Sequence, residues 1–595
     1  MRVADYIWKF LADKGVRDVF LITGGNAMHL NDALSLEKRL QTVCFHHEQA
    51  AAMAAEGYAR VDGATGVLCV TSGPGAINTL TGLYCAFADS LPVICIAGQS
   101  KKELLRSARD PEQVAGLRQL GVQEADAVSM ARPVTKYAAT ITESFCVRYE
   151  LEKAWHLATT GRPGPVFLDV PLDVQAAEVT PDDLPGFQPQ PTKPRSLAKR
   201  CNDIVSKLRD ARRPVLIGGE GIREAGAADE FLRFAERLAI PVVTAWMPDL
   251  YPPGEKFYTG RMGTLGSRAG NLAVQNADFI LAVGTRLSIP QVSFNWEHFA
   301  PKTYVVSVNV DAAELTKPIL AADETIVADP GVFMREMTAA ESLAPTDRAA
   351  RDQWIEWCRA RVRAYPEVTE AMRVVSPKGI HPYFFVEELF KRLENDAFVA
   401  CGNAASACVA FQAGPLRLGQ RLTSNASAGA MGHDLPSAIG VAIARKGKRV
   451  ICLAGDGSLM MNLQELQTVA QHQFPVGVFV MNNGGYLSIR NTQRNFFGRF
   501  IGESDASGLT FPDFAAVARA FGLRAFTLEG RAFAADMDSI LATPMPWLCE
   551  VRLDPDVGFE PCLMSRKLPD GTMVSSRLDD MFPFLSESER EKNRL

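Results

Sequence analysis

The sequence lacks both a long apolar run and a surplus of either charge. Hydrophobic residues make up 47% of its 595 residues, yet no stretch of about 18 unbroken apolar residues is present to form a membrane-spanning helix. The net charge is only −5, and no block of basic residues occurs. We therefore expect neither nucleic acid nor a membrane among its partners. The first six residues include an acidic one and do not resemble a secretory signal peptide.

Paired cysteine motifs are also missing. The 12 cysteines are scattered, several lie inside apolar runs, and none forms a Cys-x-x-Cys pair. This pattern predicts reduced core thiols in a cytoplasmic protein. It argues against a disulfide framework and against a cysteine-rich zinc site.

The sequence does contain a repeated order of apolar strand, glycine turn and helix. Apolar runs at 19–22, 67–70 and 93–97 each lead into glycine, and similar runs recur in the later parts of the chain. This order predicts an α/β fold with three doubly wound parallel sheets, and the length is too great for one domain. The predicted division is a first domain at 1–180, a linker at 181–195, a central domain at 196–345, a connector at 346–375, a third domain at 376–553 and a tail at 554–595.

Two polar turns follow neighbouring strands of the third domain. Residues 455–458 (Gly-Asp-Gly-Ser) close the apolar run 450–454, and residues 482–485 (Asn-Asn-Gly-Gly) close the next run. Ligands of α/β sheets collect at the carboxyl ends of the strands. A carboxylate, an amide oxygen and a backbone carbonyl suit Mg²⁺, and glycines allow the backbone to approach a diphosphate. Two ordinary glycine turns are the alternative, and the pairing of both motifs argues against it.

These paired motifs resemble the metal- and diphosphate-binding segment of thiamine diphosphate enzymes, and the three-domain order resembles their acetolactate synthase-like group. The resemblance implies a pyrimidine-binding first domain, a central domain and a diphosphate-binding third domain. It implies that Mg²⁺ is bound by Asp456, Asn483 and the carbonyl of Gly485. The cofactor contacts that it implies in the third domain are Asn403, Ala404, Gly455, Gly457, Ser458, Gly485 and Tyr486.

Residues 47–60 carry a second part of the resemblance, because they read His-Glu-Gln-x-Ala-x-x-x-Ala-x-Gly-Tyr-Ala-Arg. Alone, Glu48 could be an ordinary carboxylate in the first turn of a helix. In thiamine diphosphate enzymes, the glutamate of this segment hydrogen-bonds the aminopyrimidine ring and promotes removal of the thiazolium proton. By the same resemblance, Met431 supports the bent cofactor, the Gly429 carbonyl accepts from its amino group, and Gln99 is an active-site polar residue.

The central domain has glycine turns where the acetolactate synthase group binds FAD. The resemblance implies FAD in a structural role, because decarboxylation and carboligation transfer no net electrons. An arginine could pair with its pyrophosphate, and an aspartate after a strand could contact its ribose or adenine. The implied contacts are Gly218, Gly219, Gly263, Thr264, Gly284, Arg286, Asp311 and Asp329.

The resemblance further implies a homodimer as the minimum assembly, because Glu48 and the metal motif lie in different domains. It also implies that two dimers pair to form a homotetramer. The activity that it implies is a carboligase. Such an enzyme decarboxylates a small 2-keto acid, pyruvate being the expected donor, and transfers the acyl carbanion to an aldehyde or ketone, giving a 2-hydroxy ketone.

Two departures from acetolactate synthases predict a bulky, uncharged acceptor. Thr492 stands where synthases have a tryptophan, and Pro290 stands where they have an arginine that binds the second keto acid. Arg490 could replace that lost charge. The tail, including residues 568–585, is either a docked segment or a lid over the cleft. The alternatives that stay open are acetolactate synthase, a C–C hydrolase of a cyclic dione, a flavin-dependent pyruvate oxidase and a non-catalytic cofactor-binding protein.

Overall fold

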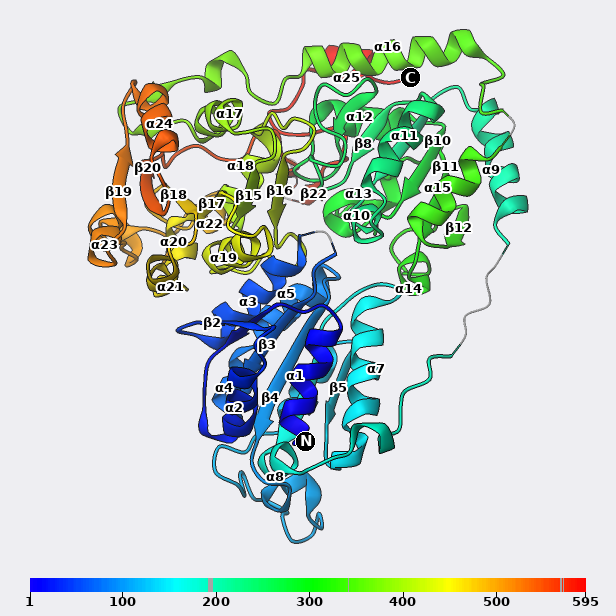
Figure 1. Cartoon of the computed structure of the whole chain (residues 1–595). Helices are drawn as coiled ribbons and strands as arrows, with labels where there is room; N and C mark the ends of the chain where they lie inside the picture. Colours follow the sequence, from blue (N-terminus) through cyan, green and yellow to red (C-terminus); the bar gives the residue numbers. More distant parts are fainter. Residues whose placement is uncertain (62, 191–195, 341, 568–569, 571) are drawn as a thin grey trace.

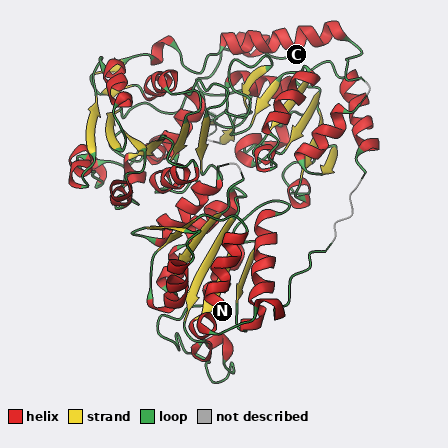
Figure 2. Ribbon diagram, viewed as in Figure 1, coloured by secondary structure: helices red, strands yellow, loops and turns green. Residues whose placement is uncertain are grey.

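The computed structural model describes residues 1–595 except 62, 191–195, 341, 568–569 and 571 (Figure 1). It contains three six-stranded parallel sheets flanked by helices (Figure 2), which confirms the predicted fold class. In Figure 1 the first domain, coloured blue to cyan, lies below the central domain in green and the third domain in yellow to orange. The limits predicted for the domains and connectors stay a prediction, and residues 191–195 of the expected linker lie outside the described residues.

The first and third sheets share one order of strands, whereas the central sheet has a different order. In the first domain the order is β2 (Gln41–Cys44), β1 (Asp18–Leu21), β3 (Gly66–Val70), β4 (Val93–Gln99), β6 (Val166–Pro171) and β5 (Tyr137–Thr140). In the central domain it is β12 (Glu324–Val327), β11 (Tyr304–Asn309), β10 (Phe279–Val283), β7 (Pro214–Gly218), β8 (Val242–Thr244) and β9 (Tyr258–Arg261). In the third domain it is β16 (Arg421–Ser424), β15 (Phe398–Cys401), β17 (Val450–Gly455), β18 (Val476–Asn482), β20 (Trp547–Arg552) and β19 (Arg524–Leu528).

The order of strands places a crevice in the third domain. The chain passes from β15 outward to β16 and then returns to β17 on the other side of β15. Such a reversal leaves an open crevice beyond the carboxyl ends of the strands, where α/β sheets bind ligands. Asn403 follows β15, Asp456 follows β17, and Asn483 follows β18. The three side chains are therefore delivered to one edge of one sheet.

The first and third domains pack through helices α3 (Glu48–Ala59) and α19 (Asp434–Ala444). Two glycines allow a very close approach. A Cβ atom at Gly440 would lie 1.9 Å from the Ala54 carbonyl oxygen, and one at Gly57 would lie 2.4 Å from that of Ser437. A side chain at either position would force the helices apart. This contact holds the two domains of one chain in a fixed relation.

The C-terminal tail docks against the central domain. Leu563 N donates to the Thr264 carbonyl oxygen at 2.7 Å, and the Arg268 side chain donates to the Pro583 carbonyl oxygen at 2.7 Å. Leu578 and Met581 are fully buried. Helix α25 (Glu587–Lys592) then lies beside the connector helix α16 (Arg348–Ala364), where Arg361 donates to the Lys592 carbonyl oxygen (Figure 1). The tail was expected to be either a docked segment or a lid over the cleft, and this arrangement is that of a docked segment.

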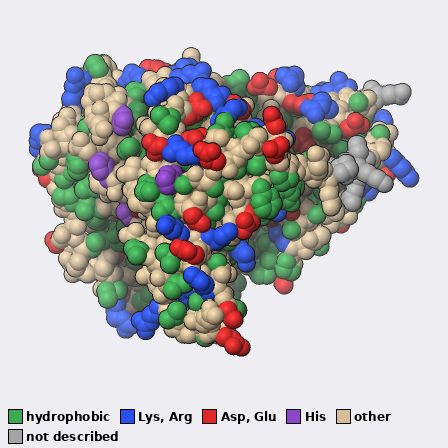
Figure 3. Space-filling view, turned by 60° about the horizontal axis from the view of Figure 1, so that its bottom comes forward, with side chains coloured by type: hydrophobic (Ala, Val, Ile, Leu, Met, Phe, Trp, Pro, Cys, Tyr) green, Lys and Arg blue, Asp and Glu red, His purple; other side chains and the backbone are tan. Residues whose placement is uncertain are grey.

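The surface carries both charges. On the face drawn in Figure 3, acidic and basic side chains are interspersed, and neither sign forms a continuous patch. Among the described residues, no helix combines the length and the hydrophobicity needed to cross a bilayer.

Candidate active site

Asp456 is buried at the carboxyl end of β17, at the start of the short helix α20 (Asp456–Leu459). Its Oδ1 accepts from Gly457 N at 2.7 Å, and its Oδ2 accepts from Gly485 N at 3.0 Å and Asn483 N at 3.2 Å. Burial raises the pKa of Asp456 to about 6, against the lowering effect of these three backbone donors. The carboxylate thus joins the two predicted motifs directly.

Asn483 indicates whether the residues at this edge of the third-domain sheet fit a metal ion. Its Oδ1 is buried and has no hydrogen-bond partner in the structure. An unpartnered buried amide oxygen is costly unless a ligand satisfies it, and oxygen donors are what Mg²⁺ takes. The described residues contain no cluster of three or more His, Cys, Asp and Glu side chains suited to a metal. A metal here would therefore rely on the mixed set of one carboxylate, one amide and backbone or diphosphate oxygens, and the residues present fit it.

The loop at 425–433, between β16 and α19, lies against the same crevice. Asn403 Nδ2 donates to the Gly429 carbonyl oxygen at 3.0 Å, and Gly432 N donates to Ser458 Oγ at 2.9 Å. Gly429 adopts a φ of +61°, a conformation that glycine adopts without strain. Asn403, Gly429 and Ser458, three of the predicted site residues, are thereby brought together with the segment that carries Met431.

Two further positions show backbone adapted to a close approach. A Cβ atom at Gly457 would lie 2.1 Å from the Tyr486 ring. Only glycine at position 457 therefore allows the ring to pack there. Ala404 has a φ of +47°, which is uncommon for a residue with a side chain. Such backbone strain clusters at ligand-binding sites.

Glu48 begins α3 in the first domain. Its Oε2 accepts from Asn78 Nδ2 at 3.0 Å, and its Oε1 lies beside Gly75. Within the described part of the chain, no hydrogen bond or ion pair joins Glu48 to the third-domain site. One chain therefore does not connect Glu48 to the Asp456 crevice by direct contacts.

Three family models match this chain. They describe the N-terminal TPP binding domain of thiamine pyrophosphate enzymes over residues 1–130, the central domain over 201–337 and the C-terminal TPP binding domain over 402–551. Thiamine pyrophosphate (TPP) is a synonym of thiamine diphosphate. All three matches follow the order of the three sheets.

The relatives cover nearly the whole chain. A probable acetolactate synthase large subunit of Methanocaldococcus jannaschii is 30% identical over 576 residues, which is 93% of this chain and 92% of the relative. A probable acetolactate synthase 2 of Oryza sativa subsp. japonica is 32% identical over 92% of this chain and 82% of its own length. The acetolactate synthase isozyme 1 large subunit of Escherichia coli K12 is 29% identical over 93% and 94%.

The chain belongs to the acetolactate synthase-like group of TPP enzymes. It is therefore a TPP-dependent carboligase. Its three sheets correspond to the N-terminal TPP binding, central and C-terminal TPP binding domains of that family.

Arg490 of this TPP enzyme is not free to bind a substrate carboxylate. It lies on α22 (Leu487–Phe496) and is buried. Its Nε donates to Glu503 Oε2 at 2.6 Å, and its Nη1 and Nη2 donate to the carbonyl oxygens of Pro555 at 2.8 Å and Gly484 at 3.2 Å. The expectation that Arg490 could replace the lost arginine is therefore wrong, because all three nitrogens are engaged within the protein, by Glu503, Pro555 and Gly484.

Gln99 also has all its polar atoms engaged. It is buried at the end of β4, where Nε2 donates to Asp169 Oδ2 at 2.9 Å and to the Ala125 carbonyl oxygen at 3.0 Å. Its Oε1 accepts from Ser100 N at 2.9 Å. Burial raises the pKa of Asp169 to about 7. A direct active-site role for Gln99 stays a prediction.

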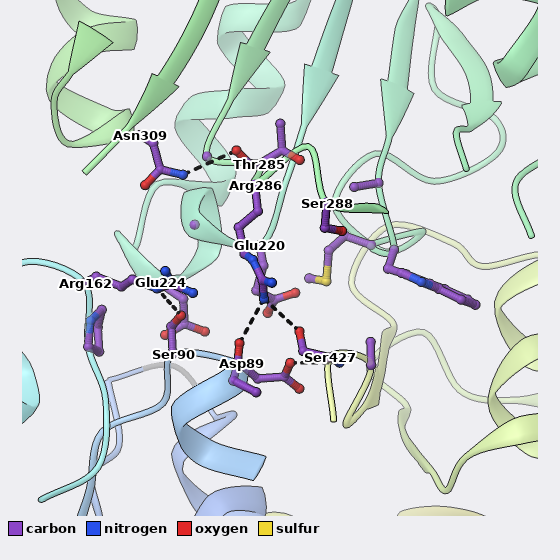
Figure 4. A pocket seen from close by; sticks show the side chains of 18 of the residues that line it. Asp89, Ser90, Arg162, Glu220, Glu224, Thr285, Arg286, Ser288, Asn309 and Ser427 are labelled. Carbon is purple, nitrogen blue, oxygen red and sulfur yellow. Dashed lines mark hydrogen bonds between the residues drawn. The ribbon is translucent and has the colours of Figure 1, made fainter. Parts of the chain in front are cut away.

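A cavity of about 490 Å³ lies where the central domain meets the other two (Figure 4). Of the eight residues predicted to bind FAD, Gly284, Arg286 and Asp329 line it. Thr264 is instead covered by the tail, and Asp311 pairs with Arg162 at 3.0 Å. The remaining predicted residues, which are not among those lining the cavity, are Gly218, Gly219 and Gly263.

Two acidic residues that the sequence did not single out face this cavity. Glu220 and Glu224 lie one helical turn apart and point into it beside Arg162 and Arg286 (Figure 4). Burial raises the pKa of Glu220 to about 7 and that of Glu224 well above its usual range. The glutamate inside the Gly-Gly-Glu-Gly turn after β7 was the available signal. No local pattern pointed to Glu503 or to Asn78, the partners of Arg490 and Glu48.

Proposed function

We propose that this carboligase decarboxylates a small 2-keto acid, with pyruvate as the donor, and adds the resulting acyl carbanion to an uncharged aldehyde or ketone. The product is a 2-hydroxy ketone. A ketone acceptor would give a tertiary alcohol. The class of reaction rests on the family, and the choice of acceptor rests on the residues beside the crevice.

The observation that carries the choice of acceptor is the engagement of Arg490. A second keto acid needs a cation for its carboxylate, and a bidentate arginine is the usual solution. Pro290 stands at the position expected for that arginine, and Arg490 is held by Glu503. Thr492 is exposed on α22 and is much smaller than the tryptophan expected at its position. A bulky neutral carbonyl compound suits this site better than a second pyruvate.

The chain's own residues have separate tasks in this proposal. Asp456, Asn483 and the Gly485 carbonyl would hold Mg²⁺, and Gly455, Gly457 and Ser458 would face the diphosphate. Met431 and Gly429 would hold TPP in its bent shape. Asn403, Ala404 and Tyr486 would be further contacts of the cofactor. When bound, TPP supplies the carbanion-stabilising carbon to which the donor adds. Glu48 of a partner chain would hold a proton at the aminopyrimidine ring.

We further propose a homodimer as the smallest active unit, paired to a homotetramer. The family resemblance supports this assembly, because it implies that Glu48 of one copy completes the third-domain site of another. In the described residues, no hydrogen bond or ion pair joins Glu48 to the third-domain site of its own chain. Large apolar side chains are exposed near both halves: Val122 is 78% exposed, and Ile501 and Phe497 are 77% and 63% exposed. Exposed apolar residues of this size are typical of protein interfaces. A cytoplasmic location, suggested by the free cysteines, belongs to the same proposal.

FAD in a structural role is also part of the proposal. The cavity of the central domain would hold it, with Arg162 and Arg286 supplying positive charge and Gly284 allowing a close approach. Glu220 and Glu224 would accept hydrogen bonds from hydroxyl groups of FAD, each carboxyl being protonated or the two sharing one proton. Absorbance of the purified protein in the flavin region, with and without added FAD, tests this part separately.

Acetolactate synthase is the second candidate, because the relatives carry that name. The deciding experiment offers pyruvate, TPP and Mg²⁺ with a panel of aldehydes and ketones and identifies products by mass. We expect a product equal in composition to the acceptor plus acetaldehyde, with CO₂ released, and little acetolactate from pyruvate alone. Acetolactate as the dominant product with every acceptor present would favour the second candidate.

A further inference from the structure

The loop at 425–433, which carries Gly429 and Met431, is held at both ends by the first domain of the same chain. At its start, Asn425 Nδ2 donates to Asp89 Oδ2 at 3.1 Å, and Ser427 N donates to Asp89 Oδ1 at 3.1 Å. At its end, His433 Nε2 lies 2.7 Å from Glu56 Oε2. Two carboxylates of one domain therefore bracket a loop of another.

Arg60 connects these two carboxylates. Its Nη2 donates to Asp89 Oδ2 at 2.7 Å, its Nε lies 3.1 Å from both oxygens of Glu56, and its Nη2 also contacts Glu56. Glu56 lies in the last turn of α3, Arg60 directly follows that helix, and Asp89 directly follows α5 (Leu80–Ala88). We call Glu56, Arg60 and Asp89 the bridge.

The bridge is withdrawn from solvent. Glu56 is 0% exposed, and the side chains of Arg60 and Asp89 are 6% and 8% exposed. The loop residues that contact the bridge, His433 and Asn425, are 1% and 2% exposed. The pKa of Glu56, which burial would raise, is instead lowered to about 2 by Arg60 and His433. Buried ion pairs contribute little net stability, but removal of one partner leaves the other charge buried and uncompensated, so the pairs favour one geometry. A network of this kind is expected where an arrangement must be specific.

The middle of the loop contrasts with its ends. Residues 426, 427 and 429 are exposed, and Gly429 and Gly432 adopt φ values of +61° and +81°. Besides the bridge, the loop is held by Arg286 Nη1, which donates to Ser427 Oγ at 3.1 Å and to the Ala88 carbonyl oxygen at 3.1 Å (Figure 4). The exposed middle, with the predicted cofactor residues, thus depends on anchored ends for its shape.

We propose that Glu56, Arg60 and Asp89 are positioning residues that fix the loop at 425–433 in the shape that receives bent TPP. The inference rests on the proposed roles of Gly429 and Met431. Helix α3 then has two tasks, since its first residue, Glu48, faces a partner's site and its later residues shape the site of their own chain.

The test compares two ligands by titration calorimetry on the full-length protein: TPP with Mg²⁺, and inorganic pyrophosphate with Mg²⁺. Pyrophosphate reports only the Asp456 end of the site, whereas TPP also needs the loop. In Asp89→Asn we expect TPP affinity to fall roughly tenfold to hundredfold, the range of other supporting residues, with pyrophosphate affinity unchanged. Glu56→Gln is the second variant, should Asp89→Asn fail to fold.

Glu367→Gln is the matched control, because it breaks the ion pair of buried Arg261 in the central domain, at 3.1 Å, away from the loop. It should lower the melting temperature without changing TPP affinity. Unchanged TPP affinity in folded Asp89→Asn and Glu56→Gln, or an equal loss for both ligands, would overturn the proposal. A wild-type protein that does not bind TPP would instead refute the proposed function on which it rests.

Discussion

Arg490 could serve the site in two ways, by binding a substrate or by supporting the turn after β18. If it bound a substrate, its loss would raise a KM, whereas the structure shows it closing the turn that contains Asn483 and Gly484. The pair with Glu503 is buried, with side chains 8% and 6% exposed. Arg490 therefore belongs to the support of the metal motif.

We predict that Arg490→Gln destabilises the protein by about 3–5 kcal/mol, because it leaves Glu503 buried without its partner. Chemical denaturation measures this change. Arg494→Gln on the same helix is the control, since Arg494 is 44% exposed and 4.0 Å from Asp556, and it should change stability by less than about 1 kcal/mol. A normal unfolding free energy for Arg490→Gln with a selectively raised KM for the acceptor would restore the substrate-binding account.

Residue patterns predicted the Asp456–Asn483 contact because parallel strands must end at one sheet edge. They could not predict Arg490–Glu503, because Glu503 lies in an irregular segment with no periodicity. The Glu56–His433 contact was equally hidden, since its partners are 377 positions apart and depend on how two domains pack.

At the scale of elements, the tail acts as a strap on the central domain. Leu578 is fully buried and belongs to the same core cluster as Val215 and Ile280 of the central sheet. A lid would instead present exposed apolar residues over a cleft. The sequence of the tail contains Pro and Gly together with one short apolar segment, 581–585. This composition could not distinguish a strap from a lid, because both need it.

We predict that Leu578→Ala lowers the free energy of unfolding by about 2–5 kcal/mol, as the loss of a buried leucine does elsewhere. Its kcat should be normal below the melting temperature. Leu595→Ala, whose side chain is 58% exposed, is the control and should resemble wild type. Reduced kcat with unchanged stability would show that the tail works as a lid.

At the scale of the whole molecule, the cavity shared by three domains should respond to pH. The folded pKa of Glu220 is raised to about 7 by burial, so the folded state holds a proton that the unfolded state releases at lower pH. The stability contributed by this group therefore falls as pH rises from about 4.5 to 7. Over the upper part of this range the cavity also gains negative charge.

We predict that FAD binds on the order of tenfold more weakly at pH 8 than at pH 6, because ionised Glu220 repels its diphosphate. Glu220→Gln should bind FAD with less dependence on pH, as fluorescence titration of FAD would show. A wild-type affinity that is constant over this range would contradict the role given to Glu220.

The most direct test of the central claim asks whether one site takes Glu48 from one chain and Asp456 from another. Glu48→Gln and Asp456→Asn, each inactive alone, are co-expressed with different tags, and the doubly tagged dimer is purified and assayed for CO₂ release from pyruvate with TPP and Mg²⁺. We predict about half of the wild-type activity, because a two-fold dimer of the two variants contains one intact site. A doubly tagged dimer that stays as inactive as its parents would contradict the account.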